Sequence, residues 1–127
     1  MNILLDTHIF LWYISDEDRI PAPMLASIRN PDNAVYLSVV SLWEIIIKYQ
    51  LGKIPLAGSP EVYIPVERQR HLIASLSVDE ASVKQLIKLP SLHRDPFDRL
   101  LICQAREHGM ALATVDGIIK AYPVETL

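Results

Sequence analysis

The sequence predicts an α/β fold, a three-layer α/β/α sandwich with a central parallel sheet, in a single domain over residues 1–127. Short apolar runs alternate with longer segments of helical character, a pattern typical of a parallel sheet covered by helices on both faces. Half of the 127 residues are apolar, which suits one hydrophobic core. The chain has no internal repeat or long linker, and Pro and Gly mark turns rather than a domain boundary.

Four apolar runs have the length and composition of buried strands, and Val124 marks a fifth candidate. The four lie at residues 3–5, 34–37, 73–76 and 110–113. Helices are expected between them, at residues 8–15, 22–29, 41–51, 60–70, 80–89 and 96–108.

The helix expected at 41–51 has an apolar stripe at positions i, i+3, i+4 and i+7, formed by Leu42, Ile45, Ile46 and Tyr49. Gly52 is placed to end it in a left-handed cap. Trp43 and Ile47 lie off the stripe, so the helix is apolar nearly all round. We therefore expect it to be buried on more than one side, against the sheet and against a second subunit.

The helix expected at 96–108 carries signals at both ends. Asp95 is a good N-cap, Pro96 fits the first helical turn, and Gly109 closes the helix. The next segment, MALAT, then has the character of the following strand.

Composition narrows the class of protein. No apolar run approaches the roughly 18 to 20 residues that cross a bilayer, and MNILLDTH carries an acid where a signal peptide would be basic, so we expect a cytoplasmic protein without a membrane partner. The single cysteine, Cys103, excludes a disulfide framework and a thiolate metal cluster. A net charge of −3 argues against a protein that binds nucleic acid through its overall charge. A nuclease remains compatible, because an acidic site loaded with divalent cations supplies local positive charge.

Five acids are expected at one edge of the sheet, where the carboxyl ends of parallel strands form the functional crevice. Asp6 directly follows the first strand, and Asp116 follows the strand at 110–113. Asp95 and Asp98 open one helix, and Glu44 lies in the first turn of another.

Each acid also has a structural interpretation. Helix capping would account for Asp6, Asp95 and Asp98. For Asp95 capping is the better interpretation, whereas for Asp98, and for Asp116 as a turn residue, both interpretations stay open. Glu44 could pair with Lys48 at i+4, but its apolar neighbours make a freely solvated carboxylate unfavourable.

Acids that converge from separate strand ends would repel one another unless a cation lay between them. Carboxylates suit Mg²⁺ or Mn²⁺, whereas the histidines show no zinc-ligand spacing such as HExxH. His93, nearest the acids, and His8 are therefore expected to have structural or substrate-contacting roles. Such a centre can hydrolyse a phosphodiester without a protein nucleophile, and the chain has no P-loop, GxSxG, GxGxxG or Cys/His pair.

Four segments in order carry a resemblance to a known family, namely LLDTHIFLW (4–12), SVVSLWEIIIKYQLGK (38–53), HRDPFDRLLICQA (93–105) and LATVDGII (112–119). Together they resemble the PIN-domain family, and specifically the VapC-like toxins of bacterial type II toxin-antitoxin pairs. The resemblance implies Mg²⁺- or Mn²⁺-dependent endoribonuclease activity on RNA, homodimers, and an antitoxin whose C-terminal segment enters the active-site groove.

By motif position, the resemblance implies that the four family acids are Asp6, Glu44, Asp98 and Asp116, with Asp95 as an additional acid. It also implies that the hydroxyl groups of Thr7 and Thr114 orient this cluster, and it places Ser38 and Ser41 where the family often has hydroxyl residues near the second acid. As a hypothesis, Asp6 and Asp98 hold a first ion, while Glu44 and Asp116 position a second ion or its waters. The cations expected to contact the RNA backbone are Arg99, Arg94, Lys48 and Lys53.

Two rival functions remain at this point. One is a non-catalytic RNA- or partner-binding module that keeps the fold and uses the acids structurally. The other is a phosphatase of small phosphoesters, although an aspartyl phosphatase would place a second Asp where His8 stands.

Overall fold

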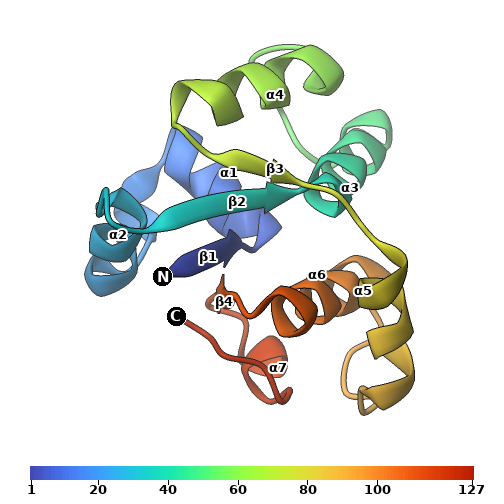
Figure 1. Ribbon diagram of the computed structural model, residues 1–127. Coiled ribbons are helices and arrows are strands. Elements are labelled where there is room, and N and C mark those ends of the chain that lie inside the picture. The colour runs from blue at the N-terminus through green and yellow to red at the C-terminus, as the bar shows by residue number, and fades with distance from the viewer.

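The computed structural model describes residues 1–127, which form a four-stranded sheet and seven α-helices (Figure 1). The strands are β1 (Asn2–Leu5), β2 (Ala34–Ser38), β3 (Ala74–Leu76) and β4 (Ala111–Ala113). All pairs are parallel, as predicted, and the strand order is β3-β2-β1-β4. The fifth strand expected at Val124 is wrong, because the last residues contribute only an isolated bridge between Thr126 and Leu112.

The helices are α1 (Thr7–Ser15), α2 (Ala22–Arg29), α3 (Val39–Gln50), α4 (Pro60–Arg70), α5 (Glu80–Lys84), α6 (Pro96–His108) and α7 (Gly117–Lys120). Short 3₁₀ helices lie at Glu17–Arg19 and Gln85–Lys88. The segment expected as one helix at 80–89 is therefore α5 followed by a 3₁₀ turn. The sequence analysis missed α7, because four residues are too few to show helical periodicity.

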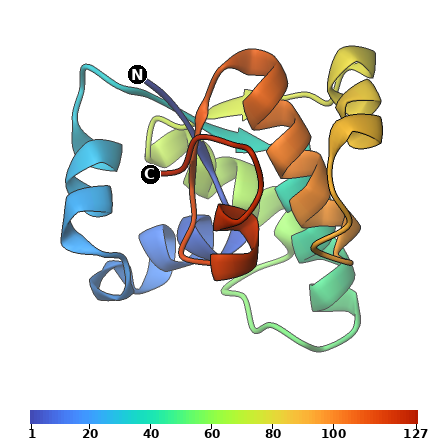
Figure 2. The same ribbon diagram turned by 90° about the horizontal axis from the view of Figure 1, so that it is seen from below.

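Two hydrophobic clusters on opposite faces of the sheet make the three layers. Ile3 and Leu5 of β1 belong to one cluster with residues of α1, α2, α3 and α4. Leu4 points the other way and packs with α6 and α7. Figures 1 and 2 show α1, α2 and α4 on one side of the sheet and α5, α6 and α7 on the other. The predicted sandwich is confirmed.

Helix α3 differs from its prediction at its start and leaves the aromatic side chain of Trp43 exposed. It begins at Val39, because the Ser38 hydroxyl accepts a hydrogen bond from the Val40 amide, so Glu44 lies in the second turn rather than the first. Trp43 is 52% exposed and rests edge-on against Phe97, with ring centroids 4.8 Å apart. In the single chain α3 packs against α1, α4 and α6, with Val40 in one hydrophobic cluster and Ile45 in the other, so burial on more than one side is confirmed. Burial against a second subunit stays a prediction.

Three strands lead almost directly into helices at the same edge of the sheet. Asp6, Ser38 and Asp116 follow or end β1, β2 and β4, and each caps the next helix with its own side chain. The fold thus delivers three polar side chains to one edge of the sheet through its strand-to-helix turns. No helix combines the length and the apolar character needed to cross a bilayer.

Candidate active site: an acidic cavity

A cavity of about 260 Å³ opens at the carboxyl ends of the strands. Its lining contains all five acids of the sequence analysis, Asp6, Glu44, Asp95, Asp98 and Asp116. The other residues that line it are His8, Trp12, Lys48 and Val115. Acids from β1, α3, α6 and the β4–α7 turn therefore share one space, and the expected convergence is confirmed.

Asp6 directly follows β1 and is 5% exposed, and its two carboxylate oxygens have different hydrogen-bond partners. Oδ1 accepts a hydrogen bond from the His8 amide at 3.0 Å and caps α1, while Oδ2 accepts from the Thr114 hydroxyl at 2.6 Å. Burial raises the pKa of Asp6, and these two hydrogen bonds offset part of the increase. Capping and membership of the cluster are compatible roles for this acid.

Glu44 is 2% exposed and is held by Thr7 and Lys48, with Ser41 bonded in turn to Thr7. The Thr7 hydroxyl lies 2.8 Å from Glu44 Oε1 and 2.8 Å from Ser41 Oγ. A carboxylate only accepts, so Thr7 donates to Glu44 and the Ser41 hydroxyl donates to Thr7. Lys48 Nζ lies 2.7 Å from Glu44 Oε2, which confirms the i+4 pair while keeping both groups in the cavity.

The first turn of α6 places two acids side by side. Asp95 Oδ1 accepts from the amides of Phe97 at 2.8 Å and Asp98 at 3.4 Å, so its capping role is confirmed. The pKa of Asp98 is raised to about 7, first by burial and then by the negative charges of Asp95, Asp6 and Glu44. Burial is the main cause of this increase, and the neighbouring carboxylates add to it.

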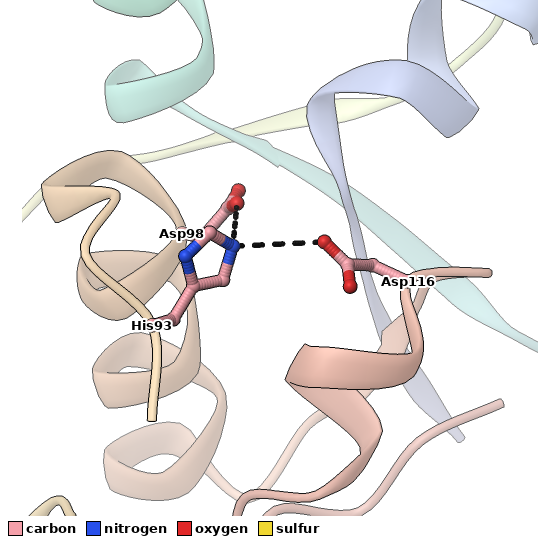
Figure 3. A group of neighbouring side chains, drawn as sticks. All are labelled: His93, Asp98 and Asp116. Atoms are coloured by element: carbon pink, nitrogen blue, oxygen red, sulfur yellow. Dashed lines mark ion pairs between the residues drawn. The ribbon is translucent and has the colours of Figure 1, made fainter. Parts of the chain in front are cut away.

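His93 joins two of the acids from the loop that precedes α6 (Figure 3). Its Nε2 lies 2.9 Å from Asp98 Oδ2 and 3.6 Å from Asp116 Oδ2. Asp116 meanwhile caps α7, since its Oδ1 accepts from the Ile118 amide at 2.8 Å. From the sequence, His93 is expected to have a structural or substrate-contacting role, and its place two residues before the cap Asp95 brings it to the same edge.

Two of the expected RNA-contacting cations lie elsewhere. Arg99 donates to the carbonyl of Pro90 and to the hydroxyl of Tyr122, both through NH1, which directs it away from the acids. Arg94 and Arg99 line a separate cavity beside α5 and α6. Of the cations expected to contact RNA, the structure brings Lys48 into the acidic cavity.

The donor set fits a hard divalent cation. Carboxylate oxygens dominate the lining, and oxygen is the ligand that Mg²⁺ and Mn²⁺ prefer. Donor atoms of His93, Asp98 and Asp116 lie within 4.8 Å of one another. The raised pKa of Asp98 points the same way, because burial and the neighbouring negative charges both disfavour its ionised form, and a cation would offset both effects.

Two curated proteins of Mycobacterium tuberculosis (strain ATCC 25618 / H37Rv) are similar in sequence. Ribonuclease VapC22 is 25% identical over 126 residues, covering 95% of this chain and 92% of that protein. Ribonuclease VapC16 is 39% identical over 56 residues, which span 44% of this chain and 40% of the relative's length.

Solved structures share the fold. VapBC2 from Rickettsia felis, bound to a DNA fragment from its promoter, superposes with a TM-score of 0.72 at 17% identity and covers 100% of this chain and 97% of that one. A toxin-antitoxin complex from Klebsiella pneumoniae gives a TM-score of 0.60 at 15% identity, covering 94% and 90% of the two chains. A sequence model of the PIN domain matches residues 3–125, so this chain belongs to the PIN domain family.

Proposed function

We propose that the protein is a Mg²⁺- or Mn²⁺-dependent endoribonuclease that hydrolyses RNA phosphodiesters, and the toxin of a toxin-antitoxin pair. The observation that carries this proposal is the convergence of Asp6, Glu44, Asp98 and Asp116 in one cavity of a PIN domain fold. The ribonucleases of the VapC type, to which the chain is similar, supply the substrate class.

Asp6, Asp98 and Asp116 are the acids best placed to hold the metal, with Glu44 beside them. A divalent cation bound there would supply a water of lowered pKa and positive charge for the phosphodiester. The hydroxyls of Thr114 and Thr7 orient Asp6 and Glu44 by donating to one oxygen of each. These contacts fix the carboxylates before any ligand arrives.

Lys48 is the residue best placed to contact a substrate phosphate. Its ammonium lies in the cavity and is held 2.7 Å from Glu44 Oε2, so one edge of an otherwise acidic space is positive. A phosphate that approaches the acids would be attracted by this charge. Asp95 is assigned to helix capping in this scheme, since its Oδ1 is already shared by two amides.

The proposed partners are an antitoxin protein and a second copy of the chain. Solved relatives of this fold include a structure described as a toxin-antitoxin complex. The exposed Trp43 on α3 offers an apolar surface for a homodimer, as the family resemblance implies. Such a toxin would act in the cytoplasm, where its RNA substrate lies.

The test is cleavage of mixed RNA by the purified protein with Mn²⁺ and with EDTA, comparing wild type with Asp98→Asn. We expect Mn²⁺-dependent products from wild type and a loss of at least 100-fold in the variant. Asp79→Asn is the matched control, because Asp79 caps α5 outside the cavity.

The rival functions give different results in the same assay. RNA bound without cleavage would favour the non-catalytic module. Turnover of p-nitrophenyl phosphate with RNA left intact would favour a phosphatase. Full activity of Asp98→Asn would remove the assignment of the site.

A further inference from the structure

We infer that His93 is a positioning residue for the metal site: its Nε2–H group holds Asp98, and the hydroxyl of Tyr122 holds the His93 loop in place. The inference rests on the proposed function, because it concerns how the chain prepares Asp98 for a divalent cation. His93 lies in the loop before α6, and Tyr122 follows α7, so the contact joins two separate parts of the chain.

The hydrogen bonds of the imidazole define which nitrogen carries the proton. The amide of Asp95 donates to His93 Nδ1 at 3.2 Å, so Nδ1 is the acceptor. In the neutral ring the proton is then on Nε2, which lies 2.9 Å from Asp98 Oδ2 and donates to it.

The same contact argues against His93 as a metal ligand. A ring that bound a cation through Nε2 would carry its proton on Nδ1, facing the amide proton of Asp95. Two donors would then point at each other at 3.2 Å. The amide of Asp95 therefore favours the form of His93 in which Nε2 is a hydrogen-bond donor and not a metal ligand.

Tyr122 holds the loop of His93 through its hydroxyl group. Its hydroxyl oxygen lies 2.7 Å from the amide nitrogen of His93 and 3.1 Å from that of Leu92, and both amides donate to it. Arg99 NH1 donates to the same oxygen at 3.1 Å. Tyr122 is only 3% exposed, so these contacts are shielded from water. Arg99 thus contributes to the site by its hydrogen bond to Tyr122. This role replaces the RNA contact expected from its position in the motif.

Holding one oxygen of Asp98 restricts the rotation of its carboxylate and leaves the other oxygen as an acceptor. Partners of this kind orient metal-ligating carboxylates, and their removal costs about 10- to 100-fold in metal affinity or activity. His93 also faces Asp116 at 3.6 Å, so its ring sets the separation of two acids that approach from different helices.

Mn²⁺ affinity of the full chain, measured by isothermal titration calorimetry, tests the inference. His93→Phe keeps a planar aromatic ring without a donor, and we expect its Mn²⁺ affinity to fall about 10- to 100-fold. His93→Gln, whose amide nitrogen can reach the Nε2 position, should stay within about threefold of wild type. Tyr122→Phe should weaken Mn²⁺ binding about 3- to 10-fold through the loop alone.

His108→Gln is the remote control. His108 is the last residue of α6, outside the acidic cavity, and it pairs with Asp79. Thermal melting of each variant in EDTA checks that the fold is intact. Wild-type affinity in folded His93→Phe would overturn the inference while leaving the proposed function standing. A wild-type protein that binds no Mn²⁺ would overturn both.

Electron spin echo envelope modulation of the Mn²⁺-loaded protein separates a positioning residue from a ligand. We expect no coupling from a directly coordinated ¹⁴N nucleus in wild type. Such a coupling in wild type that disappears in His93→Gln would make His93 a ligand and overturn the inference.

Discussion

Individual carboxylates in the acidic cavity serve two purposes at once. Asp6 and Asp116 each use Oδ1 to cap a helix, while Oδ2 of each faces another polar group of the site. Asn at either position keeps an oxygen for the cap and removes the charge. Substitution by Asn can therefore separate the electrostatic role of an acid from its part in folding.

Asp98→Asn should melt higher than wild type in EDTA at pH 8, by roughly 2 to 5 °C. Without metal, the ionised Asp98 repels Asp95, Asp6 and Glu44, and the amide removes this repulsion without changing volume. Differential scanning calorimetry measures the effect, with Asp79→Asn as the control. A lower melting temperature for Asp98→Asn would mean that the carboxylate stabilises the metal-free fold.

The pKa of Asp98 also predicts how stability depends on pH. The folded value is about 7, above the unfolded value of 3.8, so the native state binds more protons between these two limits. The free energy of unfolding in EDTA should therefore fall as pH rises from about 4 to 7. Urea unfolding at several pH values measures this slope, which should be smaller in Asp98→Asn. An equal slope in both proteins would assign it to other groups.

At the level of helices, end signals decided how well the sequence predicted each element. The cap Asp95 and the terminal Gly109 located α6 at both ends, because both signals are local and chemically specific. The start of α3 was displaced because Ser38, which the sequence analysis placed in neither the strand nor the helix, caps the helix. The position of His93 beside Asp116 depends on how two distant loops meet, and no spacing in the sequence encodes it.

The end of α4 offers a prediction about backbone strain. Leu72 has a φ of 57°, in the left-handed region, and its side chain is 91% exposed. The left-handed conformation costs a residue with a Cβ about 1–2 kcal/mol, and Gly avoids this cost. Gly also gives the unfolded chain more conformational entropy, which offsets about 0.5–1 kcal/mol of the stability gained by the substitution. Leu72→Gly should therefore raise the free energy of unfolding by about 0.5–1 kcal/mol.

Gly109→Ala is the matched opposite change. Gly109 has a φ of 63° and open space around an added Cβ, so only backbone strain is introduced. We expect a loss of about 1 kcal/mol in urea unfolding. Equal stability of both variants and wild type would show that the left-handed positions carry no strain.

Over the whole molecule, the parallel sheet turns acids that are far apart in sequence into neighbours. Alternating strands and helices were enough to predict the layers and the common edge, because parallel strands end together. Side-chain directions at that edge were beyond the sequence, as Arg99 shows: its contact with Tyr122 follows from the path of the loop before α6.

Metal binding should stabilise the whole fold. A cation that binds only the native cavity adds about 2.7 kcal/mol at a concentration 100 times its dissociation constant. Mn²⁺ should thus raise the melting temperature of wild type, and the increase should be much smaller in Asp98→Asn. A similar increase in both proteins would place the stabilising ion outside the acidic cavity.

The hydrogen bond from Thr114 to Asp6 joins residues 108 positions apart. A ribosome that adds about 5 to 20 residues per second needs roughly 5 to 20 seconds to pass from one to the other. During that interval the nascent polypeptide has its first acid but neither Thr114 nor Asp116. An unfinished chain therefore has no assembled centre, and translation that stops before these residues yields a fragment without one.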